Sequence, residues 1–316
     1  MKNKFQKFYP LFFGILLTAF TLYVLLDAFV IPRSYREVPD YSVQSQSSFG
    51  ASGNTGSMQQ PASGSSSPGG EDSVSVTESS YSDDNISIQI TQYREYDTDI
   101  YVADIILSDA GYLKTAFASN IYGKNITQKT SVIAENNQAI LAINGDYYGA
   151  RNGYVIRNGV LYRDTSSDSA QEDLVIYADG SFEIVTEGTV SASELLDRGA
   201  QQVLSFGPGL LKNGEIAVEP DTEVDKAKNS NPRTAVGIFN NLHYVMVVAD
   251  GRTEQSAGLS LYELAEFMQS LGVQTAYNLD GGGSSAMVFH GPVINRPTTN
   301  GSRITERKVS DIVYIG

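Results

Sequence analysis

Apolar and polar residues begin to alternate at about residue 85, in the stretch N-I-S-I-Q-I-T-Q-Y. A period of two is typical of a strand with one buried face, so this stretch predicts a strand. Similar patterns predict strands at 100–107 and 113–118. A short helix is expected at 127–137, just before the buried strand A-I-L-A-I-N.

Turn residues between alternating runs predict hairpins. Asn158-Gly159 interrupts V-I-R-N-G-V-L-Y, and Asp179-Gly180 interrupts L-V-I-Y-A-D-G-S-F-E-I. Asn-Gly and Asp-Gly are the strongest short hairpin signals, because their backbones tolerate the positive φ that such turns require. A third hairpin is expected in V-G-I-F-N-N-L-H-Y-V-M-V-V.

One helix carries signals at both ends. Ser260 and Glu263 form a capping box, apolar residues follow at helical spacing, and Gly272 ends the helix. A strand, V-Q-T-A-Y-N-L-D, then runs into three glycines. Together these patterns predict an α+β fold: a single mixed, sheet-rich domain with a few helices, from residue 85 to 316.

The first 84 residues have a different character. Lysines at positions 2, 4 and 7 precede an apolar run from 8 to 31 that is long enough to span a bilayer. We expect residues 1–33 to form a cytoplasmic tip and a transmembrane signal anchor with the N-terminus inside. A cleaved signal peptide is the alternative, but no small-residue cleavage site follows the run. Residues 34–84 are rich in serine and glycine, which predicts a disordered, flexible linker.

Composition narrows the possible chemistry. A net charge of -14 disfavours nucleic acid as a partner. The chain has no cysteine, which excludes disulfides, thiolate nucleophiles and cysteine-ligated metals. Its two histidines, His243 and His290, make a multi-histidine metal centre improbable. No cofactor is expected, although a divalent cation is not excluded.

Asp280 opens the stretch D-G-G-G-S-S at the end of a predicted strand. The backbone of Gly281, Gly282 and Gly283 permits positive φ and close approach of a ligand, and successive N–H groups can form an anion-binding nest. The hydroxyls of Ser284 and Ser285 add donors. The alternative is a glycine-rich turn where elements pack tightly.

Three further strand ends carry polar residues: N-P-R-T-A-V-G with Arg233 and Thr234, V-V-A-D-G-R with Asp250 and Arg252, and A-I-N-G-D-Y-Y-G with Asn144, Gly145 and Asp146. Arginines in such positions can clamp phosphate or carboxylate with two hydrogen bonds. The two tyrosines suit the face of a sugar. Taken singly, the first two motifs are typical of ordinary strand-end turns with a surface arginine, and the third of a turn with half-buried tyrosines.

Taken in order, four motifs resemble the phosphodiester glycosidase family: S-F-G-P-G-L-L-K-N-G, N-P-R-T-A-V-G, V-V-A-D-G-R and N-L-D-G-G-G-S-S-A-M-V. The resemblance spans about residues 139–316, and it includes Arg307 in E-R-K-V before the last strand. Asp146 departs from the family pattern, in which a small or neutral residue is common at this position.

The resemblance implies hydrolysis of a sugar-1-phosphodiester of the GlcNAc-1-phosphate type. Asp280 would act at the anomeric carbon or activate water, with Asp146 or Asp250 as its partner. Arg233, Arg252, Arg307 and the glycine backbone would hold the phosphate. Further substrate contacts are expected from Asn144, Gly145, Thr234, Ser284 and Ser285. With an anchor on the chain, the expected substrate is a cell-envelope glycan or exopolysaccharide outside the cytoplasm.

Two alternatives remain open from the residues. One is a metal-dependent phosphodiesterase or phosphoglycosyl transferase that cleaves P–O, with Asp146, Asp250 or Asp280 as oxygen ligands. The other is a non-catalytic module that binds envelope glycans.

Overall fold

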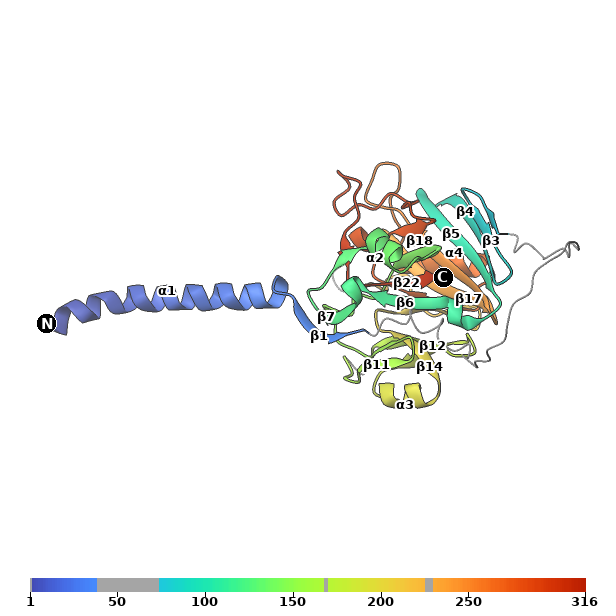
Figure 1. The fold of residues 1–316 in the computed structure, drawn as a ribbon. Helices are drawn as coiled ribbons and strands as arrows, with labels where there is room; N and C mark the ends of the chain where they lie inside the picture. Colours follow the sequence, from blue (N-terminus) through green and yellow to red (C-terminus); the bar gives the residue numbers. More distant parts are fainter. Residues whose placement is uncertain (1, 39–73, 168–169, 225–229) are drawn as a thin grey trace, which may run out of the picture.

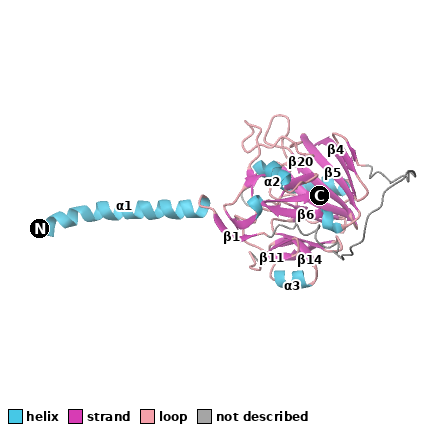
Figure 2. Ribbon diagram, in the orientation of Figure 1, coloured by secondary structure: helices cyan, strands magenta, loops and turns pink. Residues whose placement is uncertain are grey.

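A computed structural model describes residues 2–38, 74–167, 170–224 and 230–316, and it shows a sheet-rich body from which one long helix extends (Figure 1). Strands dominate the body and its helices are few (Figure 2). The predicted fold class is confirmed. Most of the predicted linker, residues 39–73, lies outside the described residues.

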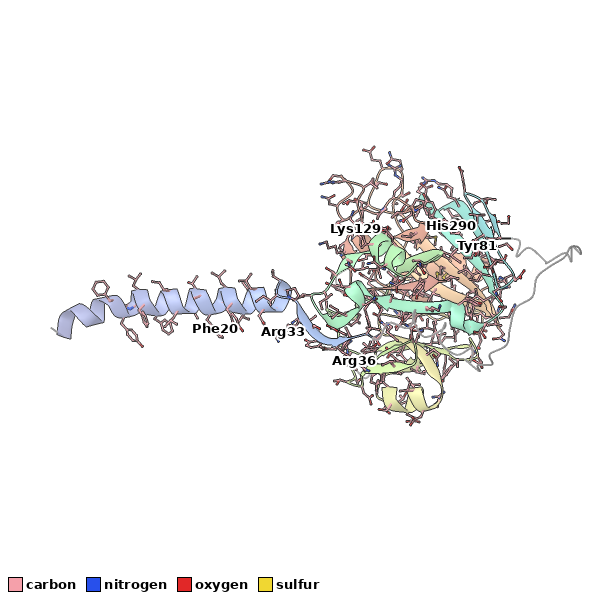
Figure 3. The ribbon with its side chains drawn as sticks, in the orientation of Figure 1. Phe20, Arg33, Arg36, Tyr81, Lys129 and His290 are labelled. Carbon is pink, nitrogen blue, oxygen red and sulfur yellow. The ribbon has the colours of Figure 1, made fainter. Side chains whose placement is uncertain are left out.

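The long helix α1 covers Lys2–Phe29. Within it, Phe8–Phe29 is long and apolar enough to cross a membrane, with a mean hydropathy of 2.0. Its apolar side chains, among them Phe20, project away from the helix without packing on the body (Figure 3). An exposed apolar surface of this length is costly in water.

The largest sheet has nine strands in the order β16-β15-β19-β17-β18-β5-β4-β3-β2. Their bounds are β2 Ser75–Val76, β3 Ser80–Ser82, β4 Ile86–Glu95, β5 Thr98–Leu107, β15 Gly209–Lys212, β16 Glu215–Ile216, β17 Arg233–Asn240, β18 His243–Ala249 and β19 Thr275–Asn278. All of these neighbours pair antiparallel. The predicted strand at residue 85 and the third predicted hairpin both belong to this sheet.

A second sheet has four strands in the order β20-β9-β22-β6, again antiparallel. Their bounds are β6 Leu113–Phe117, β9 Leu141–Asn144, β20 Met287–Phe289 and β22 Asp311–Ile315. The two sheets pack face to face around one core, in which Ile88 and Tyr277 of the first sheet join Ile143 and Val313 of the second. The segment after β19 of the first sheet meets the segment after β9 of the second, where the N–H of Asp280 donates to the carbonyl of Gly145.

One helix covers the outer face of each of these two sheets. Helix α4, Leu261–Ser270, packs on the nine-stranded sheet through residues such as Leu264 and Met268. Its predicted capping box is present, and Gly272 follows it with φ +90°. Helix α2, Thr130–Asn136, covers the four-stranded sheet through Ile133. Full burial of each such side chain contributes about 1.5–3 kcal/mol to the free energy of folding.

A third, five-stranded sheet has the order β11-β10-β14-β12-β13 and carries helix α3, Ala192–Asp197. Its strands are β10 Val155–Arg157, β11 Val160–Arg163, β12 Glu172–Tyr177, β13 Phe182–Thr186 and β14 Ala200–Leu204. Both Asn-Gly and Asp-Gly hairpins lie here, with Gly159 and Gly180 at positive φ. The small sheet has a core of its own, which includes Ile156, Val175 and Leu195.

Two short pairings complete the fold: β1 (Arg33–Glu37) with β7 (Ile121–Lys124), and β8 (Gln128–Lys129) with β21 (Lys308–Val309). The described residues also include three 3-10 turns, η2 Ala110–Tyr112, η3 Ala118–Asn120 and η4 Gly282–Ser284. Strands β1, β2 and β3 fall inside or at the edge of the segment predicted as linker. The predicted linker is thus ordered at both of its ends, because backbone pairing to the body fixes segments whose composition alone predicts disorder.

Candidate functional site

The stretch N-L-D-G-G-G-S-S forms a sharp turn between two strands, β19 and β20. Gly282–Ser284 makes a single turn of 3-10 helix there, with Gly282 at φ +60°. The sequence predicted a strand that runs into the glycines, and it gave no sign of this short 3-10 turn. A side chain at Gly282 would be strained by the left-handed backbone.

Packing against the protein explains two of the three glycines. A Cβ atom on Gly281 would lie 2.8 Å from the carbonyl oxygen of Pro232, and one on Gly283 would lie 2.4 Å from Oγ1 of Thr299. Both distances are too short for a real side chain. Tight packing, the alternative weighed for this stretch, therefore applies to Gly281 and Gly283.

Much of the turn's backbone is already hydrogen-bonded. The N–H groups that donate within the protein are those of Asp280, Gly282, Ser284 and Ser285. This leaves less of the turn for an anion than the sequence predicted. The Ser285 hydroxyl is buried and has no hydrogen-bond partner among the described residues.

Asp280 lies buried at the start of this turn, with 8% of the residue exposed. Its Oδ2 accepts a hydrogen bond from Nη2 of Arg307 at 2.9 Å. Burial raises the pKa of Asp280, while the charge of Arg307 and a hydrogen bond from Ser284 oppose that rise. A buried carboxylate that is fixed by an arginine and has a shifted pKa is a candidate functional group.

Arg307 connects the C-terminal segment to the turn. Its Nε donates to Oγ of Ser284 at 2.9 Å, beside the ion pair with Asp280. The guanidinium also lies over the ring of Tyr147, 5.9 Å from its centroid. With 41% of its side chain exposed, Arg307 has donors left for a ligand.

Arg252 approaches the same turn from the end of β18. A Cβ on Gly282 would lie 2.8 Å from its Nη2, so the guanidinium rests against that glycine. Asn231 and the carbonyl of Thr299 hold it in place, at 2.9 Å and 2.6 Å. Burial lowers the pKa of Arg252, and the nearby charge of Arg307 lowers it further. The guanidinium groups of Arg252 and Arg307 thus both lie at the glycine turn, and this concentration of positive charge favours binding of an anion there.

Arg233 is placed differently from the other two arginines. It is buried at the start of β17, where Nε donates to the carbonyl of Leu259 and Nη2 lies 3.4 Å from Oε2 of Glu223. Burial lowers the pKa of Arg233, and Glu223 opposes this. These contacts fix the Arg233 side chain within the protein, next to Gly281 of the glycine turn.

Asn144 joins the motifs at the end of β9. Its Nδ2 donates to the carbonyl of Asp280 at 2.6 Å, and its Oδ1 accepts from Oγ1 of Thr234 at 2.8 Å and from N–H of Ala286 at 3.2 Å. Gly145 accepts the N–H of Asp280 at 3.2 Å. Asn144, Gly145 and Thr234, all predicted to bind substrate, therefore position Asp280.

Asp146 points away from Asp280 into a buried ion-pair cluster. Its Oδ1 lies 2.9 Å from Nη2 of Arg157, which also pairs with Asp311 at 2.8 Å. The backbone N–H groups of Tyr148 and Ser205 also donate to Asp146. Burial and the charge of Asp146 raise the pKa of Asp311 to about 7. The Asp146 carboxylate is thus paired with Arg157, and no hydrogen bond joins it to Asp280 among the described residues.

Asp250 braces a loop. Its Oδ1 accepts from Nδ2 of Asn295 at 3.0 Å and from N–H of Arg296 at 2.9 Å. Burial raises the pKa of Asp250 and these donors oppose it. Asp250 and Asp280 share no contact among the described residues. Within those residues no group of three or more His, Cys, Asp or Glu side chains is arranged to hold a metal ion.

Arg151 belongs to the site, and the sequence analysis missed it. Its guanidinium lies over the ring of Phe206, 4.4 Å from the centroid, and its charge lowers the pKa of Asp280. Phe206 belongs to S-F-G-P-G-L-L-K-N-G, which brings that motif to the site as well. The signal was an arginine just beyond the turn N-G-D-Y-Y-G-A.

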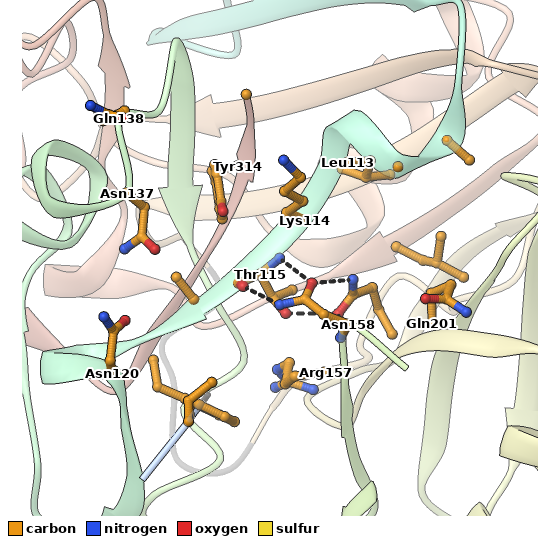
Figure 4. A pocket seen from close by; sticks show the side chains of 18 of the residues that line it. Leu113, Lys114, Thr115, Asn120, Asn137, Gln138, Arg157, Asn158, Gln201 and Tyr314 are labelled. Atoms are coloured by element: carbon orange, nitrogen blue, oxygen red, sulfur yellow. Dashed lines mark hydrogen bonds between the residues drawn. The ribbon is translucent and has the colours of Figure 1, made fainter. Parts of the chain in front are cut away.

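A cavity of about 960 Å³ lies elsewhere in the described part of the chain. Strand β6, the end of α2 and the five-stranded sheet contribute to its walls; Lys114 lies next to Tyr314, and Asn158 lies at Thr115 (Figure 4). Asn158 there exchanges hydrogen bonds with Thr115 at 2.9 and 3.2 Å. None of the predicted site residues lines this cavity, so size alone does not mark the site.

Neither histidine contacts Asp280. His243 pairs with Asp104 at 2.9 Å, and His290 lies against Tyr81, with ring centroids 5.2 Å apart (Figure 3). A Ser-His-Asp triad through either ring has no support in these contacts.

A family model described as phosphodiester glycosidase matches residues 137–316, a range that contains every predicted site residue. The chain belongs to the phosphodiester glycosidase family. Curated relatives include the human N-acetylglucosamine-1-phosphodiester alpha-N-acetylglucosaminidase, which is 34% identical over 175 residues, 50% of this chain and 33% of that protein. The SPbeta prophage-derived uncharacterized protein YomE of Bacillus subtilis (strain 168) is 29% identical over 202 residues, 62% of this chain and 31% of that protein. The chain spans about a third of the length of these relatives.

Solved structures share the fold. The zebrafish N-acetylglucosamine-1-phosphodiester alpha-N-acetylglucosaminidase catalytic domain, described as auto-inhibited by its pro-peptide, matches with a TM-score of 0.58 and 22% identity, covering 73% of this chain and 82% of that one. A hypothetical protein from Synechocystis matches with a TM-score of 0.52 and 14% identity, over 73% of this chain and 62% of that one. At such identities the likeness concerns the fold alone.

Proposed function

We propose that this member of the phosphodiester glycosidase family hydrolyses a sugar-1-phosphodiester of the GlcNAc-1-phosphate type. Water would add to the anomeric carbon, the C–O bond to phosphate would break, and a free sugar and a phosphomonoester would leave. The observation that carries the proposal is the contact of Asp280 with Arg307, beside Arg252 and the glycine turn. One carboxylate and two arginines are the groups that such a substrate needs.

Asp280 acts at the anomeric carbon, as nucleophile or as the base that activates water. The leaving phosphate is a stable anion, so a strong general acid is less necessary than for an ordinary glycoside. Arg307 and Arg252 stabilise the charge that develops on the phosphate oxygens. Asn144 and Thr234 keep the Asp280 backbone in place, and Tyr147 offers a ring to the sugar.

We propose further that α1 anchors the chain in a membrane with the N-terminus inside, because the lysines at positions 2, 4 and 7 precede the apolar run. Residues 85–316 would form the catalytic domain outside the cytoplasm, and its substrate would be a cell-envelope glycan or exopolysaccharide. Protease added to intact cells should then remove the body and leave α1 behind. Protection of the body would contradict this orientation.

The test of the activity uses the full chain in detergent micelles with the methyl-phosphate diester of GlcNAc and with UDP-GlcNAc. Wild type, Asp280→Asn and the exposed control Asp197→Asn are compared, with and without EDTA. We expect Asp280→Asn to lower kcat by about 10³-fold or more and the control to match wild type. Loss of activity with EDTA would favour the metal-dependent phosphodiesterase or phosphoglycosyl transferase. No turnover across a panel of diesters would favour a glycan-binding module.

A further inference from the structure

A second cavity, of about 280 Å³, is lined in part by the residues that follow Tyr147 in the turn after β9. The residues that line it are Tyr35, Tyr122, Gly123, Lys124, Tyr148, Gly149, Ala150, Arg151, Asn152 and Arg163. Three of them are cationic and none is acidic, on a chain whose net charge is -14. A local concentration of positive charge on an acidic protein indicates an anionic ligand.

Arg163 supplies the most specific observation. Its Nε donates to the carbonyl of Gly153 and its Nη1 to the carbonyl of Tyr148 at 3.2 Å, which fixes the guanidinium plane. Its Nη2 is buried and has no hydrogen-bond partner among the described residues. An unmet guanidinium N–H is costly, so a small shift of the Arg163 side chain, which also acts on the neighbouring Tyr122 hydroxyl, would let an oxyanion in the cavity accept from Nη2.

The cavity is joined to the candidate site by one short segment. Tyr147 lies under Arg307 at the site, and the next residues of the same turn line the cavity. Arg151 belongs to both, because it lines the cavity and its charge lowers the pKa of Asp280. A ligand bound at Asp280 therefore has a cationic path into the cavity.

The opposite side of the cavity adjoins the end of α1. Lys124 is the last residue of β7, and its backbone lies opposite Arg33 in the antiparallel pairing of β7 with β1. The next residue, Asn125, donates through Nδ2 to the carbonyls of Ala28 and Ile31, at 3.4 and 3.1 Å. The cavity thus lies between the catalytic carboxylate and the last turn of the apolar helix.

We propose that this cavity is a second anion subsite, which binds a phosphate group on the aglycone side of the substrate. The inference rests on the proposed function and narrows it: the preferred substrate is a sugar-1-phosphodiester whose aglycone carries a further phosphate. Lys124, Arg151 and Arg163 hold that group while Arg307 and Arg252 hold the scissile diester.

Binding of inorganic phosphate to the full chain in neutral-lipid nanodiscs tests the subsite without turnover. Titration calorimetry would compare wild type, Lys124→Gln, Arg163→Lys and the exposed control Lys129→Gln. We expect Lys124→Gln to weaken phosphate binding about tenfold, Arg163→Lys to weaken it as well, and Lys129→Gln to match wild type. Wild type that binds no phosphate, or Lys124→Gln that binds it like wild type, would overturn the proposal.

Kinetics then connects the subsite to the substrate. For a diester whose aglycone bears a second phosphate, Lys124→Gln should raise KM about tenfold with kcat unchanged, whereas the plain methyl diester should respond less than about twofold. Equal effects on both diesters would overturn the subsite while leaving the hydrolase intact. Absence of turnover by wild type would instead refute the proposed function, and the calorimetry would still decide on the subsite.

The anion could also come from a lipid headgroup. Nanodiscs containing phosphatidylglycerol distinguish the two sources. Unchanged phosphate affinity in these discs supports a substrate phosphate. A loss of affinity that disappears in Lys124→Gln would assign the cavity to the lipid and overturn its assignment to the aglycone.

Discussion

Nη2 of Arg307 donates to Oδ2 of Asp280 at 2.9 Å, joining the segment before the last strand to the glycine turn. Burial of Asp280 favours its neutral form, and Arg307 favours its ionised form. The balance keeps a buried carboxylate available as a base or nucleophile. Arg252, on the other side of Gly282, adds a second positive charge at the same place.

Substitution of Arg307 should move the acidic limb of the pH–rate profile. If ionised Asp280 is required, kcat/KM falls as pH drops through its pKa. Arg307→Gln removes the charge that lowers this pKa, so the limb should move to higher pH. The matched control is Arg303→Gln, an exposed arginine of the same segment, which should leave the limb in place. A limb that stays or moves to lower pH in Arg307→Gln would refute the pairing.

Gly282→Ala should reduce activity by displacing Arg252. The added Cβ would lie 2.8 Å from Nη2, on a backbone with φ +60°. Strain of this kind costs about 1–3 kcal/mol, and loss of the arginine contact should lower kcat/KM by about 10–100-fold. Gly188→Ala is the control, because Gly188 has φ +79° and no atom within 4 Å of the added Cβ. Steady-state kinetics in which both variants lose activity equally would attribute the effect to strain alone.

Arg157 should be essential for stability. It lies between the buried carboxylates of Asp146 and Asp311, at 2.9 and 2.8 Å. Arg157→Gln would leave both without their cation and should lower the free energy of unfolding by about 3–5 kcal/mol. Arg198→Gln, which breaks an exposed pair with Glu183, should cost at most about 1 kcal/mol. Urea titrations that give the two variants similar midpoints would contradict the importance of the buried cluster.

Asp173 should make the protein less stable as pH rises. Burial, with the charge of Glu187, raises the pKa of Asp173 to about 9. The folded state therefore holds a proton that the unfolded chain releases near pH 4, so stability falls between about pH 4 and about pH 9. Asp173→Asn removes this titration and should gain about 1–3 kcal/mol relative to wild type from about pH 5 to about pH 9.

The exposed control Asp197→Asn should follow the wild-type pH dependence. Thermal unfolding across this range checks both variants. A wild type whose stability is flat between these pH values, or an Asp173→Asn variant that keeps the slope, would show that Asp173 is ionised in the folded state.

Local signals predicted the fold well. Alternation located β4, turn dipeptides located the hairpins of the small sheet, and the capping box located α4. These features depend on residues close in sequence. Pairing of β1 with β7 depends on segments far apart, so composition alone assigned part of that region to a linker.

The site was predicted in part. Strand-end motifs pointed to Asp280 and Arg252, and the family resemblance added Arg307; the structure brings these three residues together. The orientation of Asp146 depends on Arg157 and Asp311, and Asp311 lies far along the chain. No local pattern contains that information. Sequence also could not separate Gly282, which faces Arg252, from Gly281 and Gly283, which pack on the protein.

Hydrolysis in water enriched in heavy oxygen tests the central claim most directly. The full chain and its Asp280→Asn variant would act on the methyl-phosphate diester of GlcNAc, and mass spectrometry would locate the label. The account predicts heavy oxygen in the released sugar. Asp280→Asn should release no labelled sugar, and EDTA should not change its release by the wild type. Heavy oxygen in the phosphate would mean P–O cleavage and would contradict the assignment of Asp280 to the anomeric carbon.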